Sequence, residues 1–202
     1  KKSTPLNFSL VVFLMLVFFL MYQIQDLSWT NSLFLILTKV AIFCVLLASV
    51  FITSFIVKRN GLSRDSSYTI FFYFLLLLFF PSALDNTNLV VSNFFILLAL
   101  RRLISLQSLK NSKEKIFDAS LWIFVAALFH FWSILFIVLV FISIIFHVSS
   151  DYRNWLLPFI ALFTIGILCA FYSAVFNVNT IEYIRSGMTT NFEINYFTNN
   201  YQ

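Results

Sequence analysis

Charged side chains are scarce in this sequence. Only 10% of its 202 residues are Asp, Glu, Lys or Arg, whereas a soluble domain carries roughly 25%. Because 61% of the residues are hydrophobic, the remaining polar side chains cannot cover a water-facing surface. The composition therefore excludes a soluble globular domain and indicates a protein that lies in a membrane.

Glycine and cysteine are also rare, and their scarcity excludes several kinds of site. Three glycines do not form a phosphate-binding glycine loop, and the two cysteines, Cys44 and Cys169, both lie inside apolar runs. Neither a disulfide framework nor a metal-ligand spacing is present. We therefore expect no metal site and no cofactor. The formal charge of +5 does not indicate nucleic acid, because the basic residues flank apolar runs.

Long apolar runs are what the sequence has in abundance, and about 20 apolar residues suffice to cross a bilayer. The longest, Ala119–Val148, contains no charged residue. As one helix it would reach about 45 Å, so it would tilt or project from the membrane. The runs together predict an all-α polytopic transmembrane helix bundle with about six spans: Ser3–Gln25, Leu33–Val57, Ser67–Ala83, Leu89–Leu100, Ala119–Val148 and Leu156–Phe176.

The chain divides by composition into two unequal parts. Residues 1–181 are expected to form the transmembrane domain, and the polar residues 182–202 a tail or loop that leads to a further C-terminal part. The chain opens on KKST and ends on a polar run. We therefore expect it to belong to a longer protein.

Lysine and arginine in short loops predict the orientation, because they favour the cytoplasmic side. With the N-terminus inside, ten basic residues fall on the inner side and Arg153 alone on the outer side. The outer turns then carry Asp26, Asp85 and Asp151. The inner residues are Lys1, Lys2, Lys58, Arg59, Arg64, Arg101, Arg102, Lys110, Lys113 and Lys115.

A basic cluster precedes the longest apolar run. Its members are Arg101, Arg102, Lys110, Lys113 and Lys115. One interpretation is a solvated flank that only sets the orientation; the other is a site for anionic lipid headgroups or an acidic partner.

Lys39 is the one basic residue within a span. It either extends its side chain to the nearby interface or pairs with an outer acid, Asp26 or Asp85, in a buried ion pair. A proton or ion relay needs further acids within the spans, and the sequence supplies none. This argues against a pump or a secondary transporter.

Most of the chain resembles an integral-membrane family of Bacteroidota. The resemblance is carried by two stretches, KRNGLSRDSSYTIFFYFLLLLFFPSALDNTNLVVSNFFILLALRRLISLQSLKNSKEKIFDASLWI and SSDYRNWLLPFI. It implies a protein of the bacterial inner (cytoplasmic) membrane, with more spans than this chain contains. It implies no activity, because that family has no assigned chemistry.

A second resemblance is to polytopic glycosyltransferases that use polyprenyl-linked sugars. These enzymes carry an essential acid in the first outer loop, where Asp26 lies, and Asp85 is the second candidate for a catalytic acid. The chain departs from that pattern, because Asp26 has no neighbouring acid and the outer turns are short.

The spans without paired ionisable groups favour a non-catalytic function. We expect a subunit or scaffold of a larger inner-membrane complex, whose partners are membrane lipids and other integral-membrane proteins. The alternative is a glycosyltransferase-like enzyme that acts on a lipid-linked substrate.

Overall fold

The computed structural model describes residues 5–24, 29–30, 32–61, 66–148 and 151–176, with residues 182 and 187. Asp26, the terminal lysines and most of the expected tail lie outside these residues. Every regular element in the described ranges is helical, which confirms the predicted all-α class. The α-helices are α1 (Pro5–Ile24), α2 (Leu33–Arg59), α3 (Ser66–Phe79), α4 (Thr87–Ile104), α5 (Ser112–Phe129), α6 (Ile137–His147) and α7 (Arg153–Phe176). Short 3₁₀ turns η2 (Pro81–Leu84), η3 (Ser105–Ser108) and η4 (Phe131–Phe136) follow α3, α4 and α5.

Local sequence signals set several helix ends. The Asn86 side chain caps α4 by accepting a hydrogen bond from the Leu89 backbone N–H at 3.2 Å. At the end of α2, the Asn60 amide donates to the Ile56 carbonyl at 2.7 Å. Gly61 then turns the chain with a φ of +61°, a conformation that favours glycine.

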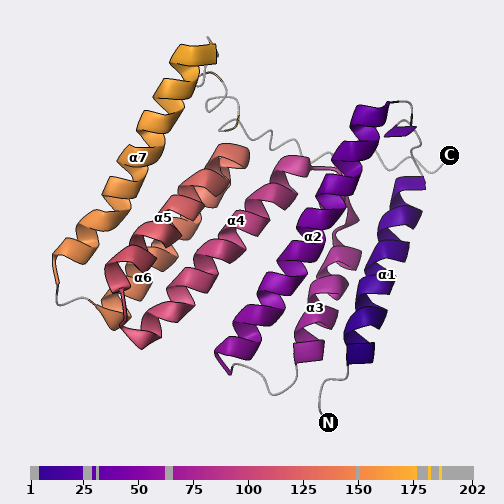
Figure 1. Ribbon diagram of the computed structural model, residues 1–202, viewed down its shortest axis with the longest axis horizontal. Helices are drawn as coiled ribbons and strands as arrows, with labels where there is room; N and C mark the ends of the chain where they lie inside the picture. The colour runs from indigo at the N-terminus through magenta and orange to yellow at the C-terminus, as the bar shows by residue number, and fades with distance from the viewer. Residues whose placement is uncertain are drawn as a thin grey trace, which may run out of the picture.

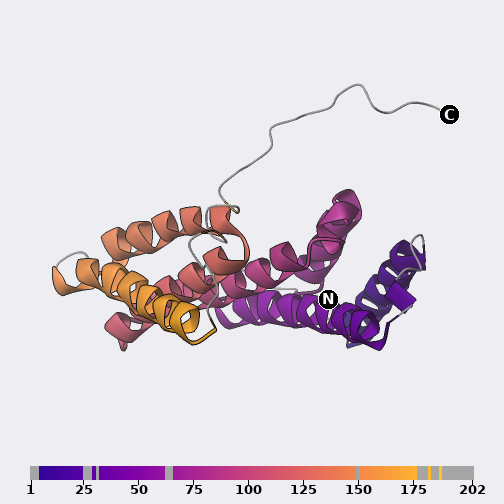
Figure 2. The ribbon, with the colours of Figure 1, turned by 90° about the horizontal axis from the view of Figure 1, so that it is seen from above.

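The helices lie side by side in an open row rather than in a closed ring. The order is α1, α3, α2, α4, α5 and α7, and α6 packs on one face of α5 (Figure 1). The view from above shows α6 displaced to one side of the row (Figure 2). An open row leaves the terminal helices exposed to whatever surrounds the protein.

Small residues allow the central helices to pack closely. Ala99 of α4 and Ala119 of α5 are almost completely buried, in a cluster that also contains Val140 and Ile144 of α6. Small side chains let helix backbones approach one another in membranes. The hydroxyls of Ser92 on α4 and Ser133 on η4 share a buried hydrogen bond of 2.6 Å.

The prediction of one helix over Ala119–Val148 is wrong. The run is split at His130, whose φ of −138° and ψ of 105° are extended, between α5 and η4. The chain then reverses, since α6 packs against α5 and ends near its start. The uncharged run gave no boundary signal. A single helix of about 45 Å would have exceeded the hydrocarbon thickness, whereas a hairpin buries both halves within it.

Three helical segments are long and apolar enough to cross a membrane: Leu33–Arg59, Thr87–Ser108 and Arg153–Phe176. Shorter apolar helices cover Ser9–Ile24, Tyr68–Phe79 and Phe131–His147. By length and composition the chain is therefore a membrane protein. The predicted set of six spans is not reproduced, because the fifth is a hairpin.

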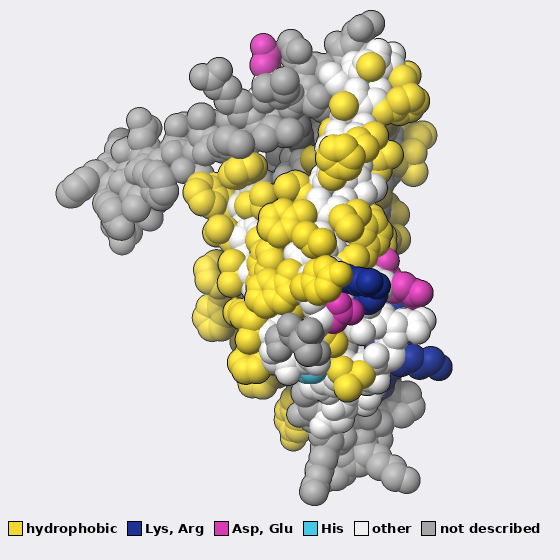
Figure 3. Space-filling model, turned by 90° about the vertical axis from the view of Figure 1, so that its left-hand side faces the viewer, with side chains coloured by type: hydrophobic (Ala, Val, Ile, Leu, Met, Phe, Trp, Pro, Cys, Tyr) yellow, Lys and Arg dark blue, Asp and Glu magenta, His cyan; other side chains and the backbone are white. Residues whose placement is uncertain are grey.

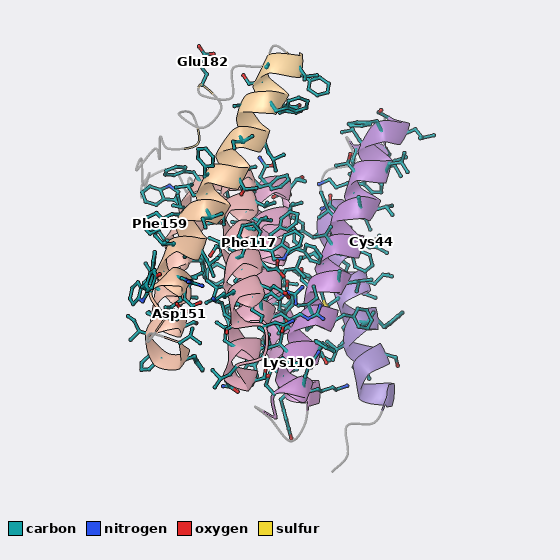
Figure 4. The ribbon with its side chains drawn as sticks, turned by 60° about the vertical axis from the view of Figure 1, so that its left-hand side comes forward. Cys44, Lys110, Phe117, Asp151, Phe159 and Glu182 are labelled. Atoms are coloured by element: carbon teal, nitrogen blue, oxygen red, sulfur yellow. The ribbon has the colours of Figure 1, made fainter. Side chains whose placement is uncertain are left out.

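The hairpin also corrects the predicted side of Asp151 and Arg153. Lys113 Nζ and Asp151 Oδ2 lie 3.3 Å apart, so these residues share one end of the molecule. Figure 4 shows Lys110 and Asp151 toward the same end, and Glu182 near the opposite one. Within the described residues, every lysine and arginine except Lys39 lies at the end that contains Lys110 and Asp151. We call it the basic end. Its members are Lys58, Arg59, Arg101, Arg102, Lys110, Lys113, Lys115 and Arg153.

Hydrophobic side chains cover the face beside α7. The space-filling view shows an almost continuous apolar surface there, with charged side chains gathered lower down (Figure 3). Phe159, Phe163 and Phe171 of α7 are each at least 60% exposed. Such a surface requires contact with lipid or with another membrane protein.

Candidate anion-binding site

The basic end is built where α2 and α4 finish side by side. Lys58 and Arg59 occupy the last turn of α2, and Arg101 and Arg102 the last turn of α4. Cations are favoured at helix C-termini, where the backbone carbonyls carry partial negative charge. Long basic side chains can also rest on apolar surface while their charged groups reach the interface.

One aromatic ring positions two of the arginines. The guanidinium carbon of Arg101 lies 4.8 Å from the centre of the Phe55 ring, and that of Arg59 lies 5.6 Å from it. Both distances are within the range of a cation–π interaction. Phe55 therefore holds charged groups from two different helices close to each other.

Two further cations of the basic end, Lys115 and Arg102, are held by polar partners. Lys115 Nζ donates to the Ser105 carbonyl and to Ser108 Oγ, each at 2.7 Å. Since an ammonium group has three donors, one is left for another acceptor. Arg102 forms a 3.0 Å ion pair with Asp118, and both side chains are partly exposed.

These four cations line a cavity of about 470 Å³ that contains no acidic residue. The walls come from the end of α2, the end of α4, η3 and the first turn of α5. The lining residues are Phe55, Ile56, Arg59, Asn60, Arg101, Arg102, Ile104, Ser105, Gln107, Ser108 and Lys115. No acid in the described part of the chain pairs with Arg59 or Arg101. Within the described residues no acid competes for these guanidinium groups, and arginine has suitable donor geometry for an external oxyanion.

The two serine hydroxyls that line the cavity are bound to backbone carbonyls. Ser105 Oγ donates to the Arg102 carbonyl, and Ser108 Oγ donates to the Ser105 carbonyl. Ser108 Oγ also accepts a hydrogen bond from Lys115 Nζ, so this hydroxyl is held from both sides. In the described ranges, His, Cys, Asp and Glu side chains do not gather into a group of three that could hold a metal ion.

The structure brings together only part of the predicted basic cluster. Arg101, Arg102 and Lys115 line the cavity, whereas Lys110 lies exposed outside it and Lys113 pairs with Asp151. Sequence reasoning missed Arg59 as a member of the cluster, although it placed Arg59 on the same side as these residues. The missing information was that α2 and α4 are neighbours.

Asp151 is an anion of the basic end, paired with Lys113. Its carboxylate accepts a hydrogen bond from the Arg153 backbone N–H at 3.2 Å. That N–H, and more weakly the Lys113 ammonium, lower the pKa of the Asp151 carboxyl below its ordinary value of 3.8. The charge of Asp151 thus ties the start of α5 to the turn before α7.

Of the two predicted catalytic acids, the structure describes only Asp85, and Asp26 lies outside the described residues. Asp85 accepts a hydrogen bond from the Tyr22 hydroxyl and lies exposed in the turn before α4. No ion pair joins Lys39 to Asp85 in this part of the chain, and a pair with Asp26 lies outside the described residues. Lys39 instead lines a separate apolar groove between α1 and α2.

Comparison of the chain with protein-family models, curated protein sequences and solved structures finds no match.

Proposed function

We propose that this chain is a non-catalytic integral-membrane protein whose basic end binds the phosphate group of an anionic phospholipid. The observation that carries the proposal is the cavity lined by four cations and no acid. Basic pockets between transmembrane helices on the cytoplasmic side are typical binding sites for anionic lipid headgroups. The lipid would fix the depth and the packing of α2, α4 and α5.

The geometry favours a phospholipid over a soluble anion. The cavity lies where α2 and α4 end, and its wall includes the apolar side chains of Phe55, Ile56 and Ile104. The adjoining parts of α2 and α4 are apolar enough to cross a membrane, and in this proposal the arginines stand at the depth of lipid phosphates. A phospholipid can place its phosphate on the guanidinium groups while its acyl chains stay beside the helices.

The charge distribution supports an orientation with the basic end in the cytoplasm. Eight basic and three acidic side chains of the described residues lie at this end, a net charge of +5. The positive-inside rule places such an end on the cytoplasmic face of a bacterial inner membrane. Arg153, which the sequence analysis placed on the outer side, also lies at this end. The difference in basic charge between the two ends is therefore larger than the sequence predicted.

The exposed face of α7 supports a role as a subunit. The helix lies at the edge of the row, and only Asn154, Pro158, Ala161 and Ile165 are buried along its 24 residues. We propose that another membrane protein of a larger complex covers part of this face. The lipid at the basic end would then stabilise the surface presented to that partner.

Lipid binding can be tested on the purified protein in a neutral detergent. Phosphatidylglycerol should raise the melting temperature saturably, because a ligand that binds only the folded state stabilises it. Arg59→Gln with Arg101→Gln should abolish the rise, and Phe55→Leu should weaken binding about two- to fivefold, as expected for a lost cation–π contact. Lys110→Gln is the matched control, since it removes a charge of the same end outside the cavity.

Two results would contradict the proposal. One is an equal loss of stabilisation in Lys110→Gln, which would indicate a diffuse charge effect. The other is full stabilisation by inorganic phosphate alone, which would identify a soluble anion as the ligand.

A further inference from the structure

Three of the four cations that line the cavity at the basic end have no acidic partner within the described residues. The fourth, Arg102, is paired with Asp118 at 3.0 Å. Arg59 and Arg101 form no ion pair with an acid in this part of the chain, and the hydrogen bonds of the Lys115 ammonium are made to uncharged oxygens. A ligand with a single negative charge would therefore leave two positive charges of the cavity uncompensated.

The two unpaired arginines lie near each other. Their guanidinium carbons are 4.8 Å and 5.6 Å from the centre of the same Phe55 ring. The two carbons are therefore at most about 10 Å apart, which is no more than about one Debye length at 0.1 M salt. The two like charges thus repel each other in spite of screening. An anion bound to both groups relieves this repulsion, and an anion with two charges relieves more of it.

The third unpaired cation, Lys115, is fixed on the wall that η3 and the start of α5 supply. Its Nζ atom donates to the Ser105 carbonyl and to Ser108 Oγ, each at 2.7 Å, and the residue lines the cavity. An ammonium group has three donors, so one remains for a ligand. Because two hydrogen bonds already hold this side chain, it loses little conformational freedom when a ligand binds.

We infer that the lipid bound in this cavity carries a phosphate monoester, as phosphatidic acid does, and that Lys115 selects it over a phosphate diester. This deepens the proposed function and rests on it, since the cavity is the same. A phosphate monoester has three terminal oxygens and a charge between −1.5 and −2 at pH 7, because its second pKa is about 6. A diester has two such oxygens and a single charge. Arg59 and Arg101 bind the phosphate of either lipid, and the remaining donor of Lys115 binds the third terminal oxygen.

The pH dependence of lipid binding reports on the phosphate rather than on the protein. Histidine is the side chain whose ordinary pKa lies near pH 6, and no histidine lines the cavity. The charged side chains at the cavity are Arg59 from α2, Arg101 and Arg102 from α4, and Lys115 and Asp118 from α5. His147, which ends α6 at the basic end, lies outside the lining. A diester lipid in the same titration controls for it, because the charge of the diester is constant.

Two matched lipids test the preference. Phosphatidic acid and phosphatidylmethanol with the same acyl chains differ only by one methyl ester, which keeps the second lipid at a single charge. Each is titrated into the purified protein in neutral detergent, and the lipid mole fraction that gives half of the maximal rise in melting temperature is measured. At pH 7.5, phosphatidic acid should need about tenfold less lipid, as for one added hydrogen bond between charged groups. At pH 5.0 this advantage should fall to about twofold, because most of the monoester has then lost its second charge.

Lys115→Gln assigns the preference to one side chain. It should reduce the advantage of phosphatidic acid at pH 7.5 to about twofold, because the third terminal oxygen loses its charged donor. Lys110→Gln removes a charge of the same end outside the cavity and should keep the full advantage. Equal half-saturation by the two lipids at pH 7.5 would overturn the inference, as would an advantage that persists at pH 5.0 or in Lys115→Gln. If neither lipid stabilises the parent protein, the proposed function itself fails, and this inference fails with it.

Two further ligands decide whether the phosphate monoester belongs to a lipid. Glycerol 3-phosphate carries the same monoester without acyl chains and should stabilise the protein far less than phosphatidic acid. Equal stabilisation would overturn the assignment to a lipid, because a soluble phosphate monoester would then be the ligand. Cardiolipin carries two diester phosphates and should not bind at a lower mole fraction than phosphatidic acid. Tighter binding of cardiolipin would show that the cavity selects two diesters, and would also overturn the inference.

Discussion

Lys113 and Asp151 form an ion pair of 3.3 Å that joins the first turn of α5 to the turn before α7. The two residues are separated by a long apolar stretch of the sequence, yet they occupy the same end of the molecule. This contact requires α5 and α6 to form a hairpin that leaves from the basic end and returns to it. It also puts the N-terminus of α7 at the basic end, so that α7 runs away from it.

The hairpin predicts that the segments around Asn111 and Tyr152 lie on the same side of the membrane. In a background with Cys44→Ser and Cys169→Ser, cysteines at Asn111 and Tyr152 should be protected from an impermeant thiol reagent added to intact cells. A cysteine at Asn88, next to the turn at the opposite end, should react. Labelling at Tyr152 but not at Asn111 would place these segments on opposite sides and contradict the hairpin.

The same ion pair predicts that the folded protein loses stability as the pH falls into the acid range. The pKa of the Asp151 carboxyl is lower in the folded protein than its ordinary value of 3.8, because the Arg153 N–H and the Lys113 ammonium favour its charged form. Its contribution to stability is therefore complete above about pH 3.8 and is lost as the pH falls through the lower folded value. Melting temperatures measured between pH 5 and pH 3 should fall less steeply in Asp151→Asn than in the parent protein.

Glu114→Gln is the control for that experiment. Glu114 is an exposed acid of the same helical turn, and its partner is the uncharged Asn111 amide. The melting temperature of Glu114→Gln should fall with pH as steeply as that of the parent protein. Equal slopes in the parent and in Asp151→Asn would show that the ion pair contributes nothing to folding.

Most helix boundaries could be predicted from the sequence where a turn residue marks them. Pro81 begins η2 just after α3, Asn86 caps α4, and Asn60 with Gly61 ends α2. The break at His130 has no such mark, because the surrounding Phe129, Phe131 and Trp132 are as apolar as the helices that they separate. The length of the run was unusual, but it was interpreted as one helix that tilts or projects from the membrane.

The site was predictable only in part, because its geometry depends on contacts between distant segments. Counting basic residues placed Arg101, Arg102 and Lys115 on one side. It could not show that Phe55 lies between Arg59 and Arg101, since that requires α2 and α4 to be adjacent. Nor could it show that Asp85 pairs with Tyr22 and leaves Lys39 without that acid.

The close approach of α4 and α5 predicts an effect of side-chain volume. Ala119 is fully buried between these helices and α6, so Ala119→Leu should destabilise the protein by about 1–3 kcal/mol through overpacking. Ala170→Leu makes the same change on the exposed surface of α7 and should have little effect. Unfolding of both variants in mixed detergent micelles measures the difference. Equal stability would mean that α4 and α5 are not held as closely as the structure shows.

A substitution at Gly166 on α7 tests whether another protein or only lipid covers this helix. A Cβ added at this position meets no heavy atom within 4 Å beyond its own helix backbone, and the residue is exposed, so the isolated chain has room for the side chain of Gly166→Leu. It should not lower stability, because leucine has the higher helix propensity. If a partner protein covers this face, the larger side chain should displace it. Quantitative mass spectrometry of the protein purified from its native membrane in mild detergent would then show the loss of one partner.

Val138→Leu is the control for the α7 experiment, since it enlarges a side chain on α6 that is 53% exposed. It should keep the parent ratio of co-purified partner to this chain, while Gly166→Leu should reduce that ratio severalfold. An unchanged ratio in Gly166→Leu would show that lipid, which adapts to an added side chain, covers the α7 face. Absence of any partner at a fixed ratio in the parent purification would contradict the subunit role itself. Lipid binding at the basic end is tested separately, because the arginine cavity is lined by α2, α4, η3 and the first turn of α5 and by no residue of α7.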